Sequence, residues 1–566
     1  MNEHAIAAVF VSLRTAEDGE ALPLGAATAA AALVQAGLVT FDDMKILSAG
    51  VDEPPAALAA KILASSPDLV GFSLYCWNSN AAIELAARLR TARPNLLLIA
   101  GGPDAERLAP GSGSRAAVGA ETEASLVFDA VFIGEAEESL VAWVRDAATG
   151  CGGNARARGR DRISANPAVF LRGKPASPAS LASPWLTGLL EPRKGGQAAW
   201  ELTRGCPFRC AYCYEGRGSA GIRRLPDERL ERELALFVER GVGEVFVLDP
   251  TFNVQSGRAL ALLRRFAEKG GDIAWNFEIR AELLDKPQAE AFASMSCSLQ
   301  IGLQSVRPEV LAAINRDMDR KKFAAKVGLL NQAGAVFGLD LIYGLPNDTL
   351  AGFKESLDYA LSLAPNHLDI FPLAVLPGTE LAERREALGL VADAEPPYLL
   401  KRHASFGEAD MASAAGLARA CGLFYTAGRA VPWFLPVLRP LRMKPSAFLA
   451  GFAEFVDARV PTAANPGHAA IEGLQIDYLS RLYTARGKDR LLPAALDLVR
   501  YYGAWSRAFA EGERARVRLS HPLRDVESPG FLSIERYCSR GIQQPCDVDI
   551  GPGKEGVFAR IARGRV

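Results

Sequence analysis

Three cysteines, Cys206, Cys210 and Cys213, are spaced CxxxCxxC, and the aromatic residue Tyr212 precedes the last of them. Cysteine thiolates are the usual ligands of iron–sulfur clusters. Three thiolates leave one iron of a four-iron cluster without a protein ligand, just as catalytic metal sites keep one position open. The spacing therefore predicts a [4Fe–4S] cluster that can bind a substrate or cofactor at its open iron.

The alternatives for these cysteines are a zinc knuckle or three incidental thiols. Zinc sites usually pair two C-x2–4-C or C/H knuckles, and no second knuckle lies close by in the sequence. The other cysteines are scattered, at Cys76, Cys151, Cys297, Cys421, Cys538 and Cys546. Cys538 and Cys546 are candidates for a second metal site or for a thiol that captures the substrate. The alternative is that they are ordinary buried or free thiols.

The elements around the cysteines alternate between strands and helices from Ala198 onwards. The strand candidates are residues 199–203, 244–248, 273–279, 298–302, 336–342 and 367–373. This rhythm predicts a partial (βα)6 barrel over residues 196–395. Active sites in βα barrels lie at the C-terminal ends of the strands, and the cysteine segment directly follows the first strand.

Residues 1–150 show a similar alternation, with apolar strand candidates at 5–11, 68–75, 95–100 and 129–133. Continuous apolar strands between helices indicate a Rossmann-like parallel sheet covered on both faces. Ligands of such sheets bind beyond the carboxyl ends of the strands. Those ends carry Ser73, Gly101, Gly102, Gly134 and Glu135. The following segment, 151–195, is rich in Gly, Arg, Pro and Ser and is predicted to be a linker.

Residues 396–566 form a predicted C-terminal domain, mainly helical from 405 to 515 and irregular over the last fifty residues. The whole chain has 566 residues, 49% of them apolar and 23% charged, which is typical of a soluble α/β protein of several domains. The net charge of −1 favours neither nucleic acid nor an anionic membrane as a partner. No signal peptide or membrane span is evident, and cysteines in a cluster motif indicate a reducing, cytoplasmic location.

The cysteine motif resembles the signature of the radical S-adenosylmethionine (radical SAM) superfamily. The resemblance implies that the open iron chelates S-adenosylmethionine and that Tyr212 contacts its adenine. It places Asp249 and Asn253 beside the methionine amino group, although the family usually has Gly-Gly-Glu there. Further SAM contacts that it implies come from the ends of the later strands: Glu278, Arg280, Gln304, Ser305, Asp340, Tyr343 and Leu345. The alternative for each is an ordinary turn or cap residue.

The N-terminal part is similar to the cobalamin-binding domain of cobalamin-dependent radical SAM enzymes. The matching segments are 71–78, 101–104 and 133–138, so the resemblance assigns Ser73, Gly101, Gly102, Gly134 and Glu135 to the cobalamin site. The D-x-H-x-x-G motif of many cobalamin proteins is absent, and His4 is the only histidine in the first 360 residues. We therefore expect no histidine below the cobalt, and Tyr75, Trp77 or a water there instead. The alternative is a Rossmann unit that has lost cobalamin.

The resemblance implies a methyltransferase that acts on an unactivated carbon of a small-molecule or peptide substrate. One SAM molecule would methylate cobalamin and a second would supply the radical, with electrons from an external donor such as flavodoxin or ferredoxin. Tyr398 and His403, and also His367, are candidate general bases, with a purely structural role as the alternative. Other possible functions are a radical cyclisation or rearrangement without methyl transfer, and a non-catalytic sensor of cobalamin or redox state.

Overall fold

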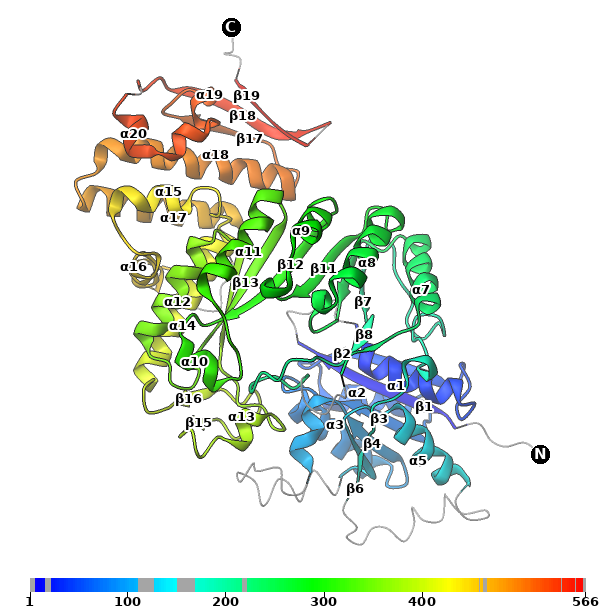
Figure 1. Cartoon of the computed structure of the whole chain (residues 1–566). Helices are drawn as coiled ribbons and strands as arrows, with labels where there is room; N and C mark the ends of the chain where they lie inside the picture. Colours follow the sequence, from blue (N-terminus) through cyan, green and yellow to red (C-terminus); the bar gives the residue numbers. More distant parts are fainter. Residues whose placement is uncertain are drawn as a thin grey trace. The chain divides into compact units, whose positions relative to one another are not determined.

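The computed structural model describes residues 6–15, 22–109, 127–149, 168–215, 221–457, 459–461, 466–540, 542–554 and 556–562, so His4 lies outside the described residues. The chain forms two compact units (Figure 1). The first comprises Met1–Ser298, Ile314–Arg316 and Ala374–His403, and the second comprises Leu299–Ala313, Asp317–Leu373 and Ala404–Val566. The domain boundaries expected at 150, 195 and 395 stay predictions.

The N-terminal sheet has six strands in the order β2-β1-β3-β4-β5-β6. Every neighbouring pair is parallel. The strands are β1 (Ala8–Arg14), β2 (Met44–Gly50), β3 (Leu69–Ser73), β4 (Leu97–Gly101), β5 (Ala130–Ile133) and β6 (Val169–Arg172). Strands β2 and β6 were not predicted. They are the two edge strands and are less completely buried than the central ones, so the sequence pattern for them is weak.

Strand β6 lies within the segment that we predicted to be a linker. It pairs with β5 over four residues, from Ala130 opposite Val169 to Ile133 opposite Arg172. Part of the Gly- and Arg-rich segment therefore completes the N-terminal sheet.

Alternate residues of β1 enter two separate cores, as expected for a sheet covered on both faces. Val9 and Val11 pack with helices α2 (Pro55–Leu63) and α3 (Ser79–Ala92). Ala8 and Phe10 pack with α1 (Leu24–Gln35) and α5 (Glu137–Thr149). The predicted Rossmann-like layering is confirmed, and it brings the carboxyl ends of β3, β4 and β5 to one edge.

The second sheet has the strand order β14-β13-β12-β11-β10-β7. Its strands are β7 (Gln197–Trp200), β10 (Glu244–Val247), β11 (Ala274–Ile279), β12 (Cys297–Gln304), β13 (Val336–Tyr343) and β14 (His367–Pro372). All six predicted strands are present in sequential order. Helices α7 (Asp227–Arg240), α8 (Ser256–Lys269), α9 (Lys286–Ala293), α11 (Arg320–Ala333) and α12 (Leu350–Ser362) alternate with them, as in a partial βα barrel.

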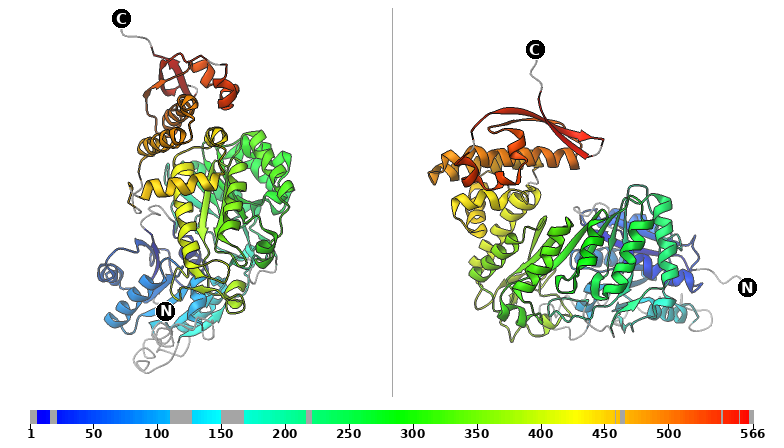
Figure 2. Two further views of the ribbon diagram at one scale, coloured as in Figure 1. Left: turned by 90° about the vertical axis from the view of Figure 1, so that its left-hand side faces the viewer. Right: turned by 45° about the horizontal axis from the view of Figure 1, so that its top comes forward.

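The C-terminal region is helical, as predicted, but its last fifty residues are not irregular. Helices α14 (Glu408–Cys421), α16 (Pro445–Asp457), α17 (His468–Ala485) and α18 (Leu492–Ala510) are followed by the antiparallel strands β17 (Ala515–Leu519), β18 (Cys546–Gly553) and β19 (Gly556–Ile561). These strands lie against α18 (Figure 2). Within the described residues, no helix is both long and apolar enough to cross a membrane.

Candidate active site

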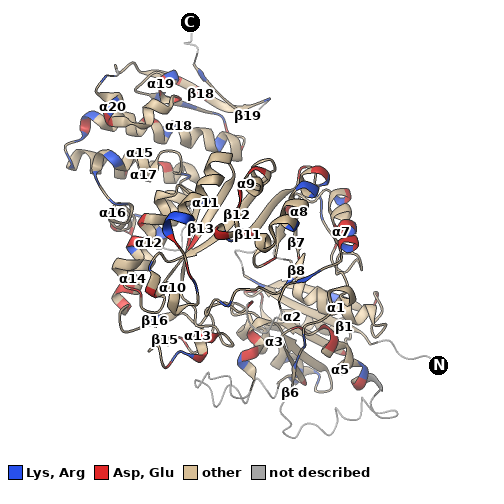
Figure 3. Ribbon diagram, viewed as in Figure 1, with Lys and Arg blue, Asp and Glu red and all other residues tan. Residues whose placement is uncertain are grey.

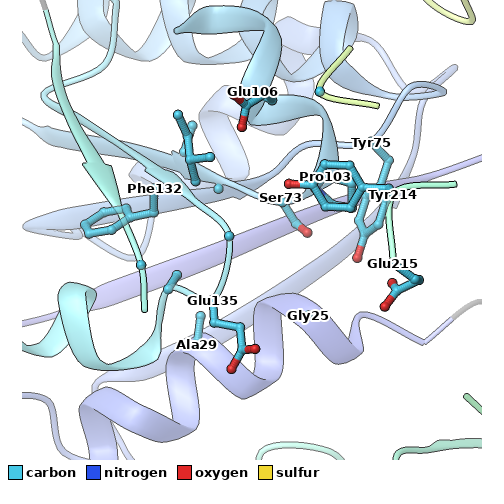
Figure 4. A pocket seen from close by; sticks show the side chains of 18 of the residues that line it. Gly25, Ala29, Ser73, Tyr75, Pro103, Glu106, Phe132, Glu135, Tyr214 and Glu215 are labelled. Carbon is cyan, nitrogen blue, oxygen red and sulfur yellow. The ribbon is translucent and has the colours of Figure 1, made fainter. Parts of the chain in front are cut away.

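The carboxyl ends of β3, β4 and β5 border a cavity of about 1500 Å³ in the first unit (Figure 4). Three parts of the chain contribute to its wall. They are the strand ends, with Ser73, Gly101, Gly102 and Gly134; the segment around the cysteines, with Thr203, Arg204, Gly205, Tyr214 and Glu215; and the segment after β14, with Gly378, Ala382 and Arg385. Since small-ligand pockets usually have about 300–1,000 Å³, this cavity suits a ligand as large as a corrin.

Glycine shapes the wall of the cavity at two positions. Gly102 has a φ of 106°, and a Cβ atom there would lie 2.5 Å from the carbonyl oxygen of Leu74. A Cβ atom on Gly25, at the start of α1, would lie 3.0 Å from the hydroxyl of Tyr75. Glycine suits the backbone conformation at Gly102, and its lack of a Cβ atom lets this part of the wall pack closely against the backbone of Leu74.

Tyr75 and Trp77 have different places. Their rings stack at a centroid distance of 4.5 Å, but only Tyr75 lines the cavity, and Trp77 is 50% exposed. Of the two aromatic residues named for the cobalamin site, Tyr75 is the one that borders the cavity, and the identity of the group below the cobalt stays a prediction. Among the described lining residues there is no histidine.

The carboxylate of Glu135 joins the end of β5 to the segment that carries the cysteines. It accepts hydrogen bonds from both terminal nitrogens of Arg223, from Arg204 at 3.2 Å and from the backbone N–H of Ala176 at 3.0 Å. Burial raises the pKa of Glu135, but the hydrogen bonds from Arg223 and Ala176 and the charges of Arg204 and Arg223 together outweigh it, so the net pKa is lowered. Arg223 and Arg204 belong to the hairpin of β8 (Thr203–Arg204) and β9 (Arg223–Arg224), so Glu135 positions the start of the cysteine loop.

The three motif cysteines follow β8 directly and form no disulfide. The backbone N–H of Cys213 donates to the carbonyl of Cys210 at 3.0 Å. Burial raises the pKa of the Cys213 thiol to about 11, and the charges of Cys210 and Cys206 act in the same direction. The three thiols lie on one segment of eight residues, Cys206 to Cys213.

The arrangement of the thiols bears on the choice between zinc and a cluster. In the part of the chain that the structure describes, no three His, Cys, Asp or Glu side chains converge as ligands of a single metal ion. A cluster is bound at its corners by separate thiolates, so its ligands need not converge on one point. The donor set of Cys206, Cys210 and Cys213 consists of thiols, and thiolates are the usual ligands of an iron–sulfur cluster.

Tyr212 belongs to the cysteine loop, and Arg280 lies against it. The hydroxyl of Tyr212 accepts a hydrogen bond of 3.3 Å from Arg316, and burial raises its pKa to about 12. The guanidinium of Arg280 lies 3.8 Å from the centre of the Phe208 ring, a cation–π contact. The structure thus brings two of the predicted SAM contacts to the loop that would hold the cluster.

The geometry gives Asp249 and Asn253 positioning roles instead of the predicted contact with the methionine amino group. Asp249 is 1% exposed, and it accepts hydrogen bonds from the N–H groups of Leu202 and Thr203, both at 2.9 Å, and from the Thr203 hydroxyl at 2.7 Å. Buried Asn253 donates to the carbonyl of Arg280 and accepts from its N–H, both at 3.0 Å. Both side chains tie backbone segments together, so neither is free to bind a ligand.

Glu278, on β11, differs from Asp249 and Asn253 in both exposure and hydrogen bonding. Its side chain is exposed, and it makes no hydrogen bond or ion pair with any described residue. Partial desolvation raises its pKa, and the negative charge of Glu215 raises it further. Of the carboxylates predicted to contact SAM in the first unit, Glu278 is the one available to a ligand.

The other predicted SAM contacts belong to the second unit. Gln304 is buried with a φ of 65°, and its Oε1 accepts no hydrogen bond from the described residues. Ser305 is buried and its hydroxyl lies 3.4 Å from that of Ser356, which indicates a structural role. Asp340 accepts a hydrogen bond from Gln300, and Tyr343 and Leu345 are buried.

Neither predicted catalytic residue lines the cavity. Tyr398 is buried and its hydroxyl donates a hydrogen bond of 2.7 Å to Asp104, while burial and the charge of Asp104 raise its pKa. His403 is 5% exposed. His367, in the second unit, is hydrogen-bonded to Gln300 at 2.8 Å, and burial lowers its pKa. Burial favours the structural alternative for Tyr398 and His403.

Several cavity residues escaped the sequence analysis. Tyr214 and Glu215 line the cavity next to the motif, and their position directly after Cys213 was a usable signal. Gly25 and Glu106 also line it, but they come from two separate segments. Only the tertiary structure brings them together.

Two family models match the chain at the domains just described. The B12 binding domain model matches residues 13–144, which contain the strand ends on one side of the cavity. The Radical SAM superfamily model matches residues 200–360, which contain the three cysteines. The chain belongs to the cobalamin-dependent radical SAM enzymes. Its cofactors are therefore a [4Fe–4S] cluster, S-adenosylmethionine and cobalamin, and the donor set and the cavity fit them.

Two curated relatives are methyltransferases. The chain is 28% identical over 360 residues to the cobalamin-dependent radical SAM methyltransferase TokK of Streptomyces tokunonensis, covering 57% of this chain and 50% of TokK. It is also 28% identical over 374 residues to the 2-(S-pantetheinyl)-carbapenam-3-carboxylate methyltransferase of Streptantibioticus cattleyicolor. This match covers 60% of this chain and 51% of the relative. The chain thus spans about half the length of these relatives.

A solved structure of the same fold is that of the cobalamin-dependent S-adenosylmethionine radical enzyme OxsB with aqua-cobalamin bound. The TM-score is 0.56 and the sequence identity 13%, over 95% of this chain and 84% of OxsB. This likeness extends the shared fold beyond the two matched domains.

Proposed function

We propose that this cobalamin-dependent radical SAM enzyme is a C-methyltransferase that acts on an unactivated carbon of a small-molecule or peptide substrate. The observation that carries the proposal is the shared cavity, because Ser73, Gly101 and Gly134 of the B12-binding domain and Gly205, Tyr214 and Glu215 of the cysteine loop line the same space. The two methyltransferase relatives support the reaction class.

The cofactors supply the difficult chemistry when bound, namely hydrogen abstraction by a radical made from SAM and methyl donation from cobalt. The chain holds and orients them. Cys206, Cys210 and Cys213 hold the cluster, and the Glu135–Arg223 contact positions the loop from which they extend. Ser73, Tyr75, Gly101, Gly102 and Gly134 border the space for the corrin.

The proposal extends to the partners and location of the enzyme. Reduction of the cluster requires an external electron donor such as flavodoxin or ferredoxin, and a reducing cytoplasm is the compartment that suits the cluster thiolates. No nucleic-acid or membrane partner is proposed, given the near-neutral net charge.

Anaerobic reconstitution with iron, sulfide and hydroxocobalamin tests the proposal first. We expect about four irons and one cobalt per chain. Incubation with deuterated-methyl SAM, a reductant and candidate substrates is then expected to yield 5′-deoxyadenosine together with a deuterium-labelled product. Iron without cobalt would overturn the methyl-transfer mechanism, and deoxyadenosine with an unmethylated, rearranged product would favour a cyclase or rearrangement enzyme.

A further inference from the structure

A second, smaller cavity of about 320 Å³ lies between helices α7 and α8 of the first unit. Three arginines line it, Arg224 at the end of β9 and Arg258 and Arg265 on α8, together with one carboxylate, Asp227. Acidic and basic side chains are mixed along α7, whereas the first three charged residues of α8 are all arginines (Figure 3). Two of these three arginines line the cavity.

Two of the three guanidinium groups at this cavity have a buried terminal nitrogen without a hydrogen-bond acceptor among the described residues. Nη2 of Arg258 and Nη1 of Arg265 are buried and donate no hydrogen bond to any described atom. Glu231 lies 3.4 Å from Nη1 of Arg265 without the geometry of a hydrogen bond. Arg224 donates only to the neutral side-chain oxygen of Gln255. A buried charged donor without an acceptor costs free energy, so an oxyanion at this point would satisfy donors that the chain leaves open.

The electrostatics of Arg258 agree with this view. Burial lowers the pKa of Arg258, the charges of Arg224 and Arg265 lower it further, and Asp249 and Asp227 compensate only in part. The N-terminus of α7, at Asp227, borders the same cavity, and its free backbone N–H groups add positive potential.

We infer that the cavity between α7 and α8 is a binding site for a phosphoryl group, held by Arg258 and Arg265 with Arg224 at its edge. Planar guanidinium groups match the oxygens of a phosphate. The volume accommodates a phosphate or the phosphate end of a nucleotide. The site is separate from the cofactor cavity, and none of its lining residues borders that cavity.

The test uses the reconstituted full chain and inorganic phosphate, followed by calorimetry and thermal unfolding. Phosphate is expected to bind saturably and to raise the melting temperature, whereas chloride at equal ionic strength is not. Arg258→Gln and Arg265→Gln are each expected to lower the affinity for phosphate at least about tenfold, because each removes a charge-assisted hydrogen bond. Arg264→Gln is the matched control, since Arg264 is the exposed neighbour on α8 outside the cavity.

Titration with AMP and with adenosine separates the two sources of a phosphoryl group. Tighter binding of AMP than of phosphate, lost in the Arg265 variant, would identify a nucleotide site, and equal binding of the two would identify a phosphate site. Absence of saturable phosphate and AMP binding, or unchanged affinity in Arg265→Gln, would overturn the inference. If Arg258→Gln does not fold, Arg265→Gln still decides the outcome.

Discussion

The hydroxyl of Tyr398 donates a hydrogen bond of 2.7 Å to Oδ1 of Asp104, which is 4% exposed. The other oxygen of Asp104 accepts a hydrogen bond from Ser79. Asp104 follows β4 next to the cavity glycines, whereas Tyr398 lies in the segment after β14, 294 residues later in the chain. The bond therefore joins two walls of the cofactor cavity, and it gives Tyr398 a positioning role.

Replacement Tyr398→Phe separates positioning from catalysis. The variant leaves buried Asp104 without one donor, so we expect a loss of about 1–3 kcal/mol in the free energy of unfolding, measured by chemical denaturation. Cluster and cobalamin loading and deoxyadenosine formation are expected to persist. A variant of unchanged stability that forms no product would instead show that Tyr398 takes part in the reaction.

Replacement of any one motif cysteine, Cys206, Cys210 or Cys213, by alanine is expected to abolish deoxyadenosine formation and to lower the iron content, because each removes one cluster ligand. Iron analysis and the visible spectrum measure the loss. Cys538→Ala is the control, since Cys538 lies on the C-terminal helix α20 (Ile534–Cys538) and should leave both readouts unchanged. Full iron loading in all three motif variants would contradict the assignment.

Replacement Gly102→Ala is expected to impair cobalamin binding. The new Cβ atom would meet the carbonyl oxygen of Leu74 at 2.5 Å, and a φ of 106° is costly for alanine. We expect about 1–3 kcal/mol of lost stability and a reduced cobalt content after reconstitution.

The matched control for this substitution is Gly473→Ala, inside α17, where the Cβ atom meets nothing within 4 Å. Alanine there should stabilise the chain by up to about 1 kcal/mol. Equal cobalt content in the two variants would show that the conformation of Gly102 does not matter for the cobalamin site.

His468 predicts a dependence of stability on pH. It is 8% exposed, and burial, then the charges of Arg429 and Arg507, lower its pKa to about 4. Its Nδ1 lies 3.0 Å from Nη1 of Arg507, so Nδ1 accepts the hydrogen bond and the ring is neutral. Between pH 6.5 and 4 the unfolded chain binds a proton that the folded chain does not, so acid destabilises the fold.

At pH 4 the low pKa of His468 destabilises the folded chain by about 3 kcal/mol relative to neutral pH. Denaturation of His468→Asn and of the parent chain at several pH values measures it, because the asparagine can still accept from Arg507 but does not titrate. As the pH falls from 6.5 to 4, the parent chain is expected to lose about 3 kcal/mol of stability relative to the His468→Asn variant. Parallel curves over this range would contradict the assignment.

Local patterns in the sequence determined the chemistry and most of the fold. The CxxxCxxC spacing lies within eight residues, Cys206 to Cys213, so neighbouring residues alone place the thiols on one loop. All six strands of the barrel sheet have enough apolar residues to be recognised. The edge strands β2 and β6 and the C-terminal strands were missed; β6 has only four residues and lies within the Gly- and Arg-rich segment that was predicted to be a linker.

The tertiary structure decided the role of each polar residue, because a role depends on which partners surround a side chain. Asp249 and Asn253 have the residue types of ligands, but their hydrogen bonds to Thr203 and Arg280 use them in positioning. Tyr398 similarly faces Asp104 and does not border the cavity. By contrast, the carboxylate of Glu278 and the hydroxyl of Tyr75 form no hydrogen bond with a described side chain. Whether a side chain has a partner from a distant segment cannot be read from the order of residues.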